Sequence, residues 1–267
     1  MFITERTFSM NSVPPNVSGQ TNPQPQAARV PISFRLNKSK PWVTYVILIV
    51  TVLIYVIQYV SLLLTNNQYD IPAALGEKVN ELILAGQVWR LITPILLHAS
   101  ILHVGFNMYA LFVLGPGLEQ YYGHRRYLLL YLIGGYAGNV LSFLLSPNPS
   151  LGASTAIFAL VAAEIVFIYR NRMLFGSRAR GMLLNMGVIV VVNLLLGLQP
   201  GIDNWGHLGG LIAGLIFGWV AGPHYQVQQT LTGLELKDIH SKNEVLWGTL
   251  LSAGLFTAIV IGRFLAG

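Results

Sequence analysis

The sequence predicts an all-α fold, a polytopic bundle of membrane-spanning helices. Hydrophobic residues make up 54% of the 267 positions and charged residues only 10%, whereas about 25% of a soluble domain is charged. The hydrophobic residues also gather in blocks close to the ~20 residues that an α-helix needs to cross a bilayer. These blocks do not alternate with polar residues as the strands of a membrane barrel do. Because only helices and closed barrels satisfy the backbone within lipid, we predict that each block is a helix.

Seven blocks predict seven spanning helices, the first six of which form a core over residues 41–222. Residues 1–40 are polar and rich in Pro, Gln and Asn, which indicates a disordered cytoplasmic tail. The segment 65–90 is long for a loop, so we expect it to have structure of its own. Residues 223–267 supply a polar cytoplasmic connector and the seventh helix. The predicted helices cover residues 43–64, 91–114, 127–145, 154–169, 182–198, 207–221 and 245–261.

The basic residues are distributed unevenly between the two sides of these helices. With the N-terminus in the cytoplasm, Lys78, Arg90 and Arg263 fall outside and the other 13 of the 16 Lys and Arg residues fall inside. This distribution obeys the positive-inside rule, so we expect a cytoplasmic N-terminus and an external C-terminus. Topology then accounts for the net charge of +6, and no nucleic-acid partner is expected. The chain has no cysteine, which excludes a thiol nucleophile and a disulfide framework.

Two of the predicted helices are too short to cross the whole bilayer and carry reactive side chains. Blocks 154–169 and 207–221 would cover about 22–24 Å, less than a hydrocarbon core of ~30 Å. One opens with Ser154 in Gly152-Ala153-Ser154 and the other with His207, so a nucleophile and a base lie at matched depth. Gly210 and Gly214 share one helical face after His207, and small residues at this spacing let helices approach closely. That spacing alone favours ordinary helix packing, but His207 is an ionisable residue inside a membrane, which indicates a functional site.

His103 and Asn107 form a third candidate element, because residues four apart share a helical face. Their side chains could donate hydrogen bonds to a tetrahedral intermediate, or they could bond to each other and only fasten helices together. Spacing supports both interpretations equally. A metal site built from His98, His103 and His207 is a weaker alternative, since a spacing of five does not place His98 and His103 on one face.

These residues fall into motifs that resemble those of the rhomboid intramembrane serine proteases, over roughly residues 42–221. Five motifs occur in the order and spacing of that family, and together they are specific although no single one is. Thr155 departs from the Gly that usually follows the nucleophile, and Phe158 stands where many members have Tyr. The matching segments are Trp89-Arg90, the stretch from His98 through His103 to Asn107, Gly115 to Gly123 with Glu119, Gly152-Ala153-Ser154, and His207 with Gly210 and Gly214.

The resemblance implies a serine endopeptidase that cleaves peptide bonds in or near transmembrane helices of membrane-protein substrates. Ser154 and His207 would form its catalytic dyad, and His103, Asn107 and the backbone N–H of Ser154 its oxyanion donors. Gly152, Phe158, Gly210, Gly214, Trp89, Arg90 and Glu119 would support the site. No cofactor or metal is implied.

The expected partners are the lipid bilayer and single-pass transmembrane substrates, and the expected location is a bacterial inner membrane. Two other classes of function compete with this prediction. A non-catalytic binder of membrane clients is disfavoured by the intact Ser154 and His207 and by Ala153, where inactive relatives carry Pro. A transporter or channel is disfavoured because the sequence has no internal repeat and few charged residues to line a pathway.

Overall fold

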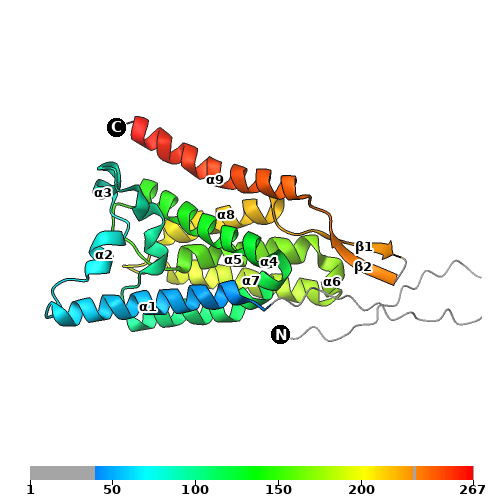
Figure 1. Ribbon diagram of the computed structural model, residues 1–267, viewed down its shortest axis with the longest axis horizontal. Coiled ribbons are helices and arrows are strands. Elements are labelled where there is room, and N and C mark those ends of the chain that lie inside the picture. Colours follow the sequence, from blue (N-terminus) through cyan, green and yellow to red (C-terminus); the bar gives the residue numbers. More distant parts are fainter. Residues whose placement is uncertain (1–39, 231–232, 267) are drawn as a thin grey trace, which may run out of the picture.

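The computed structural model describes residues 40–230 and 233–266, so the predicted tail 1–40 lies almost wholly outside the described residues. The described chain is a bundle of helices with one antiparallel hairpin (Figure 1). In chain order the elements are α1 (Trp42–Leu64), α2 (Ile71–Gly76), α3 (Asn80–Leu84), the 3-10 helices η1 (Val88–Leu91) and η2 (Thr93–Leu96), α4 (Ile101–Leu145), α5 (Ser154–Arg170), α6 (Arg172–Phe175), α7 (Arg178–Leu196), α8 (Asn204–Val220), β1 (Tyr225–Thr230), β2 (Gly233–Asp238) and α9 (Lys242–Leu265).

The helical bundle predicted from composition is confirmed. Among the described residues, α1, α4, α7 and α9 are long and apolar enough to cross a membrane. Helix α4 comprises two of the predicted spans, which are separated by a bend at Gly123, where φ of 74° and ψ of 158° are not helical. Helices α5 and α8 have 17 residues each, which confirms that these two are short.

The second predicted span begins later than expected. The apolar block predicts a start at residue 91, but residues 88–91 and 93–96 form two single-turn 3-10 helices and α4 starts at Ile101. Pro94 offers no backbone N–H to a longer helix. The Ser100 side chain accepts a hydrogen bond from the His103 N–H and so caps α4 at this point. The hydrophobic pattern extends through this corner and does not reveal it.

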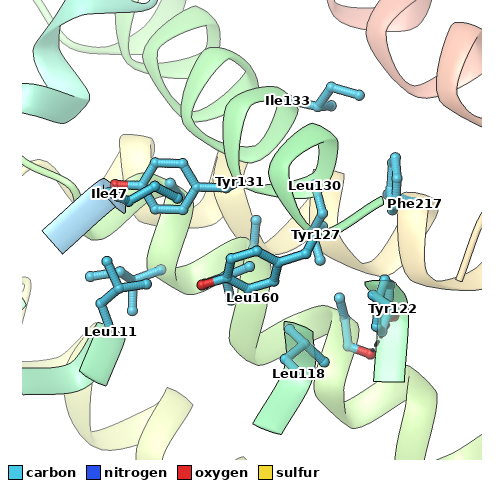
Figure 2. Close-up of a cluster of buried hydrophobic side chains, with 14 of the residues drawn as sticks. Ile47, Leu111, Leu118, Tyr122, Tyr127, Leu130, Tyr131, Ile133, Leu160 and Phe217 are labelled. Atoms are coloured by element: carbon cyan, nitrogen blue, oxygen red, sulfur yellow. Dashed lines mark hydrogen bonds between the residues drawn. The ribbon is translucent and has the colours of Figure 1, made fainter. Parts of the chain in front are cut away.

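Helices α4, α5 and α8 pack against one another at the centre of the bundle, while α1 and α9 lie at its edges (Figure 1). The buried side chains between them come from both halves of α4 and from its neighbours α1, α5 and α8, and include Leu111, Tyr127, Leu160 and Phe217 (Figure 2). Close packing of these helices fixes the relative position of the starts of α5 and α8, which carry the candidate site.

The glycine face of α8 lies directly on the backbone of α5. A Cβ atom added to Gly210 would lie 2.0 Å from the carbonyl oxygen of Thr155, and one added to Gly214 would lie 2.2 Å from that of Ala159. No side chain fits in either position. The predicted close approach at Gly210 and Gly214 therefore exists, and α5 is the partner helix.

The long segment between α1 and α4 has structure of its own, as expected, and contacts the loop that leads into α5. Lys78 donates hydrogen bonds from Nζ to the carbonyl oxygens of Ser146 and Asn148, each at 2.8 Å, and its backbone pairs with that of Ser150. Burial lowers the pKa of Lys78 to about 8. The segment thus holds the loop that immediately precedes Ser154.

The connector after α8 contains a feature that the sequence did not predict. It forms the hairpin β1–β2, which lies at the end of the bundle away from α2 and α3 (Figure 1). Asp238 on β2 pairs with Arg126 of α4, and Asn171 accepts a hydrogen bond from the Tyr225 N–H at 2.7 Å. These polar contacts attach the hairpin to α4 just after its bend at Gly123 and to the end of α5.

Candidate active site

Ser154 and His207 lie within hydrogen-bonding distance although 53 residues separate them in the chain. The Ser154 Oγ is 2.9 Å from the His207 Nε2. Ser154 is the first residue of α5, and His207 lies in the first turn of α8, which begins at Asn204 rather than at His207 as expected. Asp203 explains the earlier start, because its side chain accepts a hydrogen bond from the Gly206 N–H and caps the helix.

The imidazole of His207 is buried and held by an aromatic ring. Phe158, one turn after Ser154 on α5, stacks on it with ring centroids 4.3 Å apart and an interplanar angle of 18°. His207 is 8% exposed, and its Nδ1 has no hydrogen-bond partner among the described residues. For Nε2 to accept a proton from Ser154, the ring proton must be on Nδ1. The ring is therefore placed to act as a base toward Ser154, without a carboxylate bonded to its other nitrogen.

His103 lies beside the loop that precedes Ser154. A Cβ at Gly152, whose φ is +136°, would be 2.8 Å from the His103 Nε2 and 3.7 Å from the Ser154 Oγ. Gly152 is therefore needed both for its backbone conformation and for the space that the imidazole occupies. The Ala99 N–H points at the His103 Nδ1 from 3.5 Å, a weak contact that leaves Nε2 as the donor nitrogen facing the site.

Asn107 is buried one turn further along α4. Its Nδ2 donates to the His103 backbone oxygen at 2.9 Å, so the two residues are linked through the backbone rather than side chain to side chain. Among the described residues, neither side chain is hydrogen-bonded to Ser154. The structure places His103 next to the Ser154 loop, and it keeps Asn107 on the same face of α4.

His98 has a structural position that spacing did not indicate. Its side chain is 1% exposed, and its Nε2 accepts a hydrogen bond from the Ala153 N–H at 3.3 Å. Gln58 of α1 binds both the N–H and the carbonyl of His98, at 3.0 and 3.2 Å. His98 therefore fixes the backbone immediately before Ser154. A long-range backbone contact of this kind leaves no periodic signal in a sequence.

The predicted supporting residues Trp89, Arg90 and Glu119 lie away from the Ser154–His207 pair. Trp89 donates from Nε1 to the Leu75 carbonyl at 3.1 Å, and Arg90 donates to the carbonyls of Glu77 and Ala74 at 2.8 and 2.6 Å. Both residues brace the segment between α1 and α4.

Glu119, fully buried in α4, accepts hydrogen bonds from the backbone N–H groups of Val43 and Thr44 at 3.0 and 2.8 Å. Its carboxylate also pairs with His124. These bonds satisfy donors at the start of α1 that have no partner within their own helix. Glu119 therefore joins α1 to α4 at a distance from the candidate site.

The described residues contain no group of three or more His, Asp or Glu side chains arranged to hold a metal ion. His98 and His103 do stack edge to face, with ring centroids 5.0 Å apart. The Nε2 of His98 is engaged by the Ala153 N–H and that of His207 by Ser154. The three histidines thus serve the Ser154 region separately and do not converge on one point.

Comparison with known proteins places the chain in a family. The model of the Rhomboid domain matches residues 85–224, more than half of the sequence. The chain therefore belongs to the rhomboid family and is an integral membrane protein.

Among curated relatives, it is 41% identical over 179 residues to the rhomboid protease GluP of Bacillus subtilis, covering 67% of this chain and 34% of the relative. It is 37% identical to the chloroplastic RHOMBOID-like protein 9 of Arabidopsis thaliana, over 59% of this chain and 37% of the relative. The mitochondrial RHOMBOID-like protein 6 of the same plant is 38% identical, over 52% and 46%. The chain thus spans between a third and a half of the length of these relatives.

Proposed function

We propose that this protein is an intramembrane serine endopeptidase that hydrolyses peptide bonds in or next to transmembrane helices, using a Ser154–His207 dyad. The single observation that carries the proposal is the 2.9 Å separation of Ser154 Oγ and His207 Nε2. A serine and a histidine at this distance form a nucleophile and its general base. The name of the GluP relative, a rhomboid protease, supports the same activity for the shared segment.

In the proposed reaction, the Ser154 Oγ attacks the carbonyl carbon of the scissile bond while its proton passes to the His207 Nε2. The carbonyl oxygen becomes an oxyanion. His207 then gives the proton to the departing amine as the C–N bond breaks, which leaves an acyl ester on Ser154. Water attacks the ester with His207 again as base, and the acid product and the free hydroxyl are released.

Three donors are proposed for the oxyanion. The first is the backbone N–H of Ser154, which lacks an intrahelical partner because Ser154 begins α5. The second is His103, whose Nε2 faces the Gly152 loop. The third is Asn107, one turn below on the same helix. Gly152, Phe158, Gly210 and Gly214 support this geometry through the contacts described above.

The proposed substrates are single-pass membrane proteins, as the resemblance to the rhomboid proteases implies, and a site at the starts of two short helices would meet them within the bilayer. We also propose that the catalytic core covers residues 41–222, and that residues 223–267 add the hairpin-bearing connector and α9. The proposed location is a bacterial inner membrane with a cytoplasmic N-terminus and an external C-terminus, on the distribution of Lys and Arg.

The test is cleavage of a single-pass transmembrane reporter by the purified full chain in liposomes. Ser154→Ala and His207→Ala should each abolish cleavage while thermal stability stays close to wild type. Ser252→Ala is the matched control, since this buried α9 serine bonds only to the Gly248 carbonyl one turn back. This variant should cleave the reporter at the wild-type rate. Wild-type turnover by either dyad variant would contradict the proposal.

A further inference from the structure

A groove lies at the end of the bundle opposite Ser154, where α5 ends and α7 begins. Its volume is about 470 Å³, within the usual range of ligand sites. Helix α5 contributes its last turn, α6 one side and the first two turns of α7 the other. Residues that line the groove include Tyr169, Arg172, Met173, Ser177, Arg180 and Leu184.

The two arginines of the groove carry charges that the protein itself does not neutralise. Arg172 and Arg180 are exposed, and neither forms an ion pair or a hydrogen bond with another described residue. Arg126 and Arg170 differ, because Arg126 pairs with Asp238 and Arg170 donates to the Trp219 carbonyl and to His224. The first turn of α7 contains no acidic residue. The groove therefore presents two free guanidinium groups to an anion.

The rest of the groove is mostly apolar and continues onto a face of α7 that would contact lipid. Met173 is 72% exposed and Leu184 62%, and Val188 and Val191 continue the exposed apolar surface further along the helix. A soluble anion would gain nothing from these walls. A ligand with a negatively charged headgroup and a hydrocarbon tail would contact both the arginines and the apolar walls. The bilayer around a membrane protein contains such ligands.

We propose that this groove binds an anionic phospholipid, with its phosphate between Arg172 and Arg180 and an acyl chain along α7. Basic pockets between helices at the membrane surface are suited to such headgroups. Helix α7 is poorly packed in the bundle, because Ala179 is the one buried residue along its described length. A lipid that contacts both α6 and α7 adds contacts that this helix otherwise lacks and stabilises its attachment to α5.

The test is the thermal stability of the purified full chain in neutral detergent, titrated with phosphatidylglycerol or with phosphatidylcholine of the same acyl chains. A ligand that binds only the folded state raises the melting temperature with its concentration. Phosphatidylglycerol should stabilise the wild type, and high salt should weaken the effect. In Arg172→Gln/Arg180→Gln the required concentration should rise roughly 30-fold, from about fivefold for each arginine.

Arg125→Gln/Arg178→Gln is the matched control, because it removes the same charge from two exposed arginines outside the groove and should respond like wild type. Arg172→Lys/Arg180→Lys keeps the charge and should retain most of the effect. If the double glutamine variant does not fold, each single variant should still show its fivefold shift. Equal responses in the groove and control variants, or equal stabilisation by phosphatidylcholine, would overturn the proposal. Neither outcome depends on peptidase activity, so the result is independent of the proposed function.

Discussion

Gly210→Ala tests whether the contact between α5 and α8 sets the geometry of the proposed dyad. The glycine lies one turn after His207, and its contact on α5 is the backbone of Thr155, the residue next to Ser154. The added methyl group would lie 2.0 Å from the Thr155 carbonyl oxygen, where ordinary contact starts at 3.4 Å. A rigid backbone atom cannot move aside as a flexible side chain can.

The difference between these two distances is about 1.4 Å, which the helices must absorb by moving apart. Since the clash lies between the two segments that carry Ser154 and His207, most of this shift would appear in their 2.9 Å separation. A misplacement of about 1 Å in a catalytic group can cost ~10²-fold in rate. Overpacking of this kind also destabilises by about 1–3 kcal/mol. We therefore expect kcat/KM to fall by about two orders of magnitude.

The assay is cleavage of the transmembrane reporter, together with a melting curve that reports the folded fraction. Gly187→Ala is the control, because a Cβ at this α7 position meets nothing within 4 Å. Gly218→Ala should be milder than Gly210→Ala, since its nearest atom would be 3.1 Å away. Full activity in Gly210→Ala would refute the argument that this packing positions the dyad.

Three further predictions concern the oxyanion donors, the topology and the connector. His103→Ala and Asn107→Ala should each lower kcat more than they raise KM, and loss of one oxyanion donor can lower kcat by up to roughly 10²–10³-fold. An unchanged kcat in steady-state kinetics would mean that these residues only hold helices together. In intact cells an impermeant maleimide should label Asn148→Cys but should reach Ser177→Cys only after the membrane is opened, and the reverse order would invert the topology. Burial and the charge of Arg170 lower the pKa of His224 in the folded state from its usual 6.5. The neutral ring should therefore stabilise the fold above about pH 6.5. This contribution should be lost as the pH falls toward the lower folded-state pKa. Melting curves against pH should show a smaller acid loss in His224→Asn, and an unchanged profile would contradict this role.

The sequence predicted the helical fold well because membrane helices depend on a local signal, the length and apolarity of a block. It also singled out Ser154 and His207, which the structure brings to 2.9 Å from each other, since polar residues at the starts of short apolar helices are conspicuous. It did not predict the hairpin, whose strand Tyr225–Thr230 has only six residues and is held by long-range contacts such as that from Asn171. The bend that separates the two spans within α4 depends on the single backbone conformation of Gly123, which composition does not determine.

His98 shows the same limit at the candidate site. Its bond to the Ala153 N–H spans 55 residues, and its position depends on Gln58 in another helix. The pattern suggested a metal ligand as a weak alternative, but the structure uses this imidazole to fix the Ser154 loop. Tertiary packing determines which distant residues become hydrogen-bond partners, and the periodicity of the sequence does not reveal these pairs.

The most direct test of the Ser154–His207 dyad is covalent labelling of the purified protein with a fluorophosphonate probe, followed by mass mapping of the labelled peptide. We expect a single label on Ser154, no labelling of Ser154→Ala and strongly slowed labelling of His207→Ala, with Ser252→Ala labelled like wild type. Wild-type labelling of Ser154→Ala, or a label that maps to a peptide without Ser154, would contradict the assignment of Ser154 as the nucleophile.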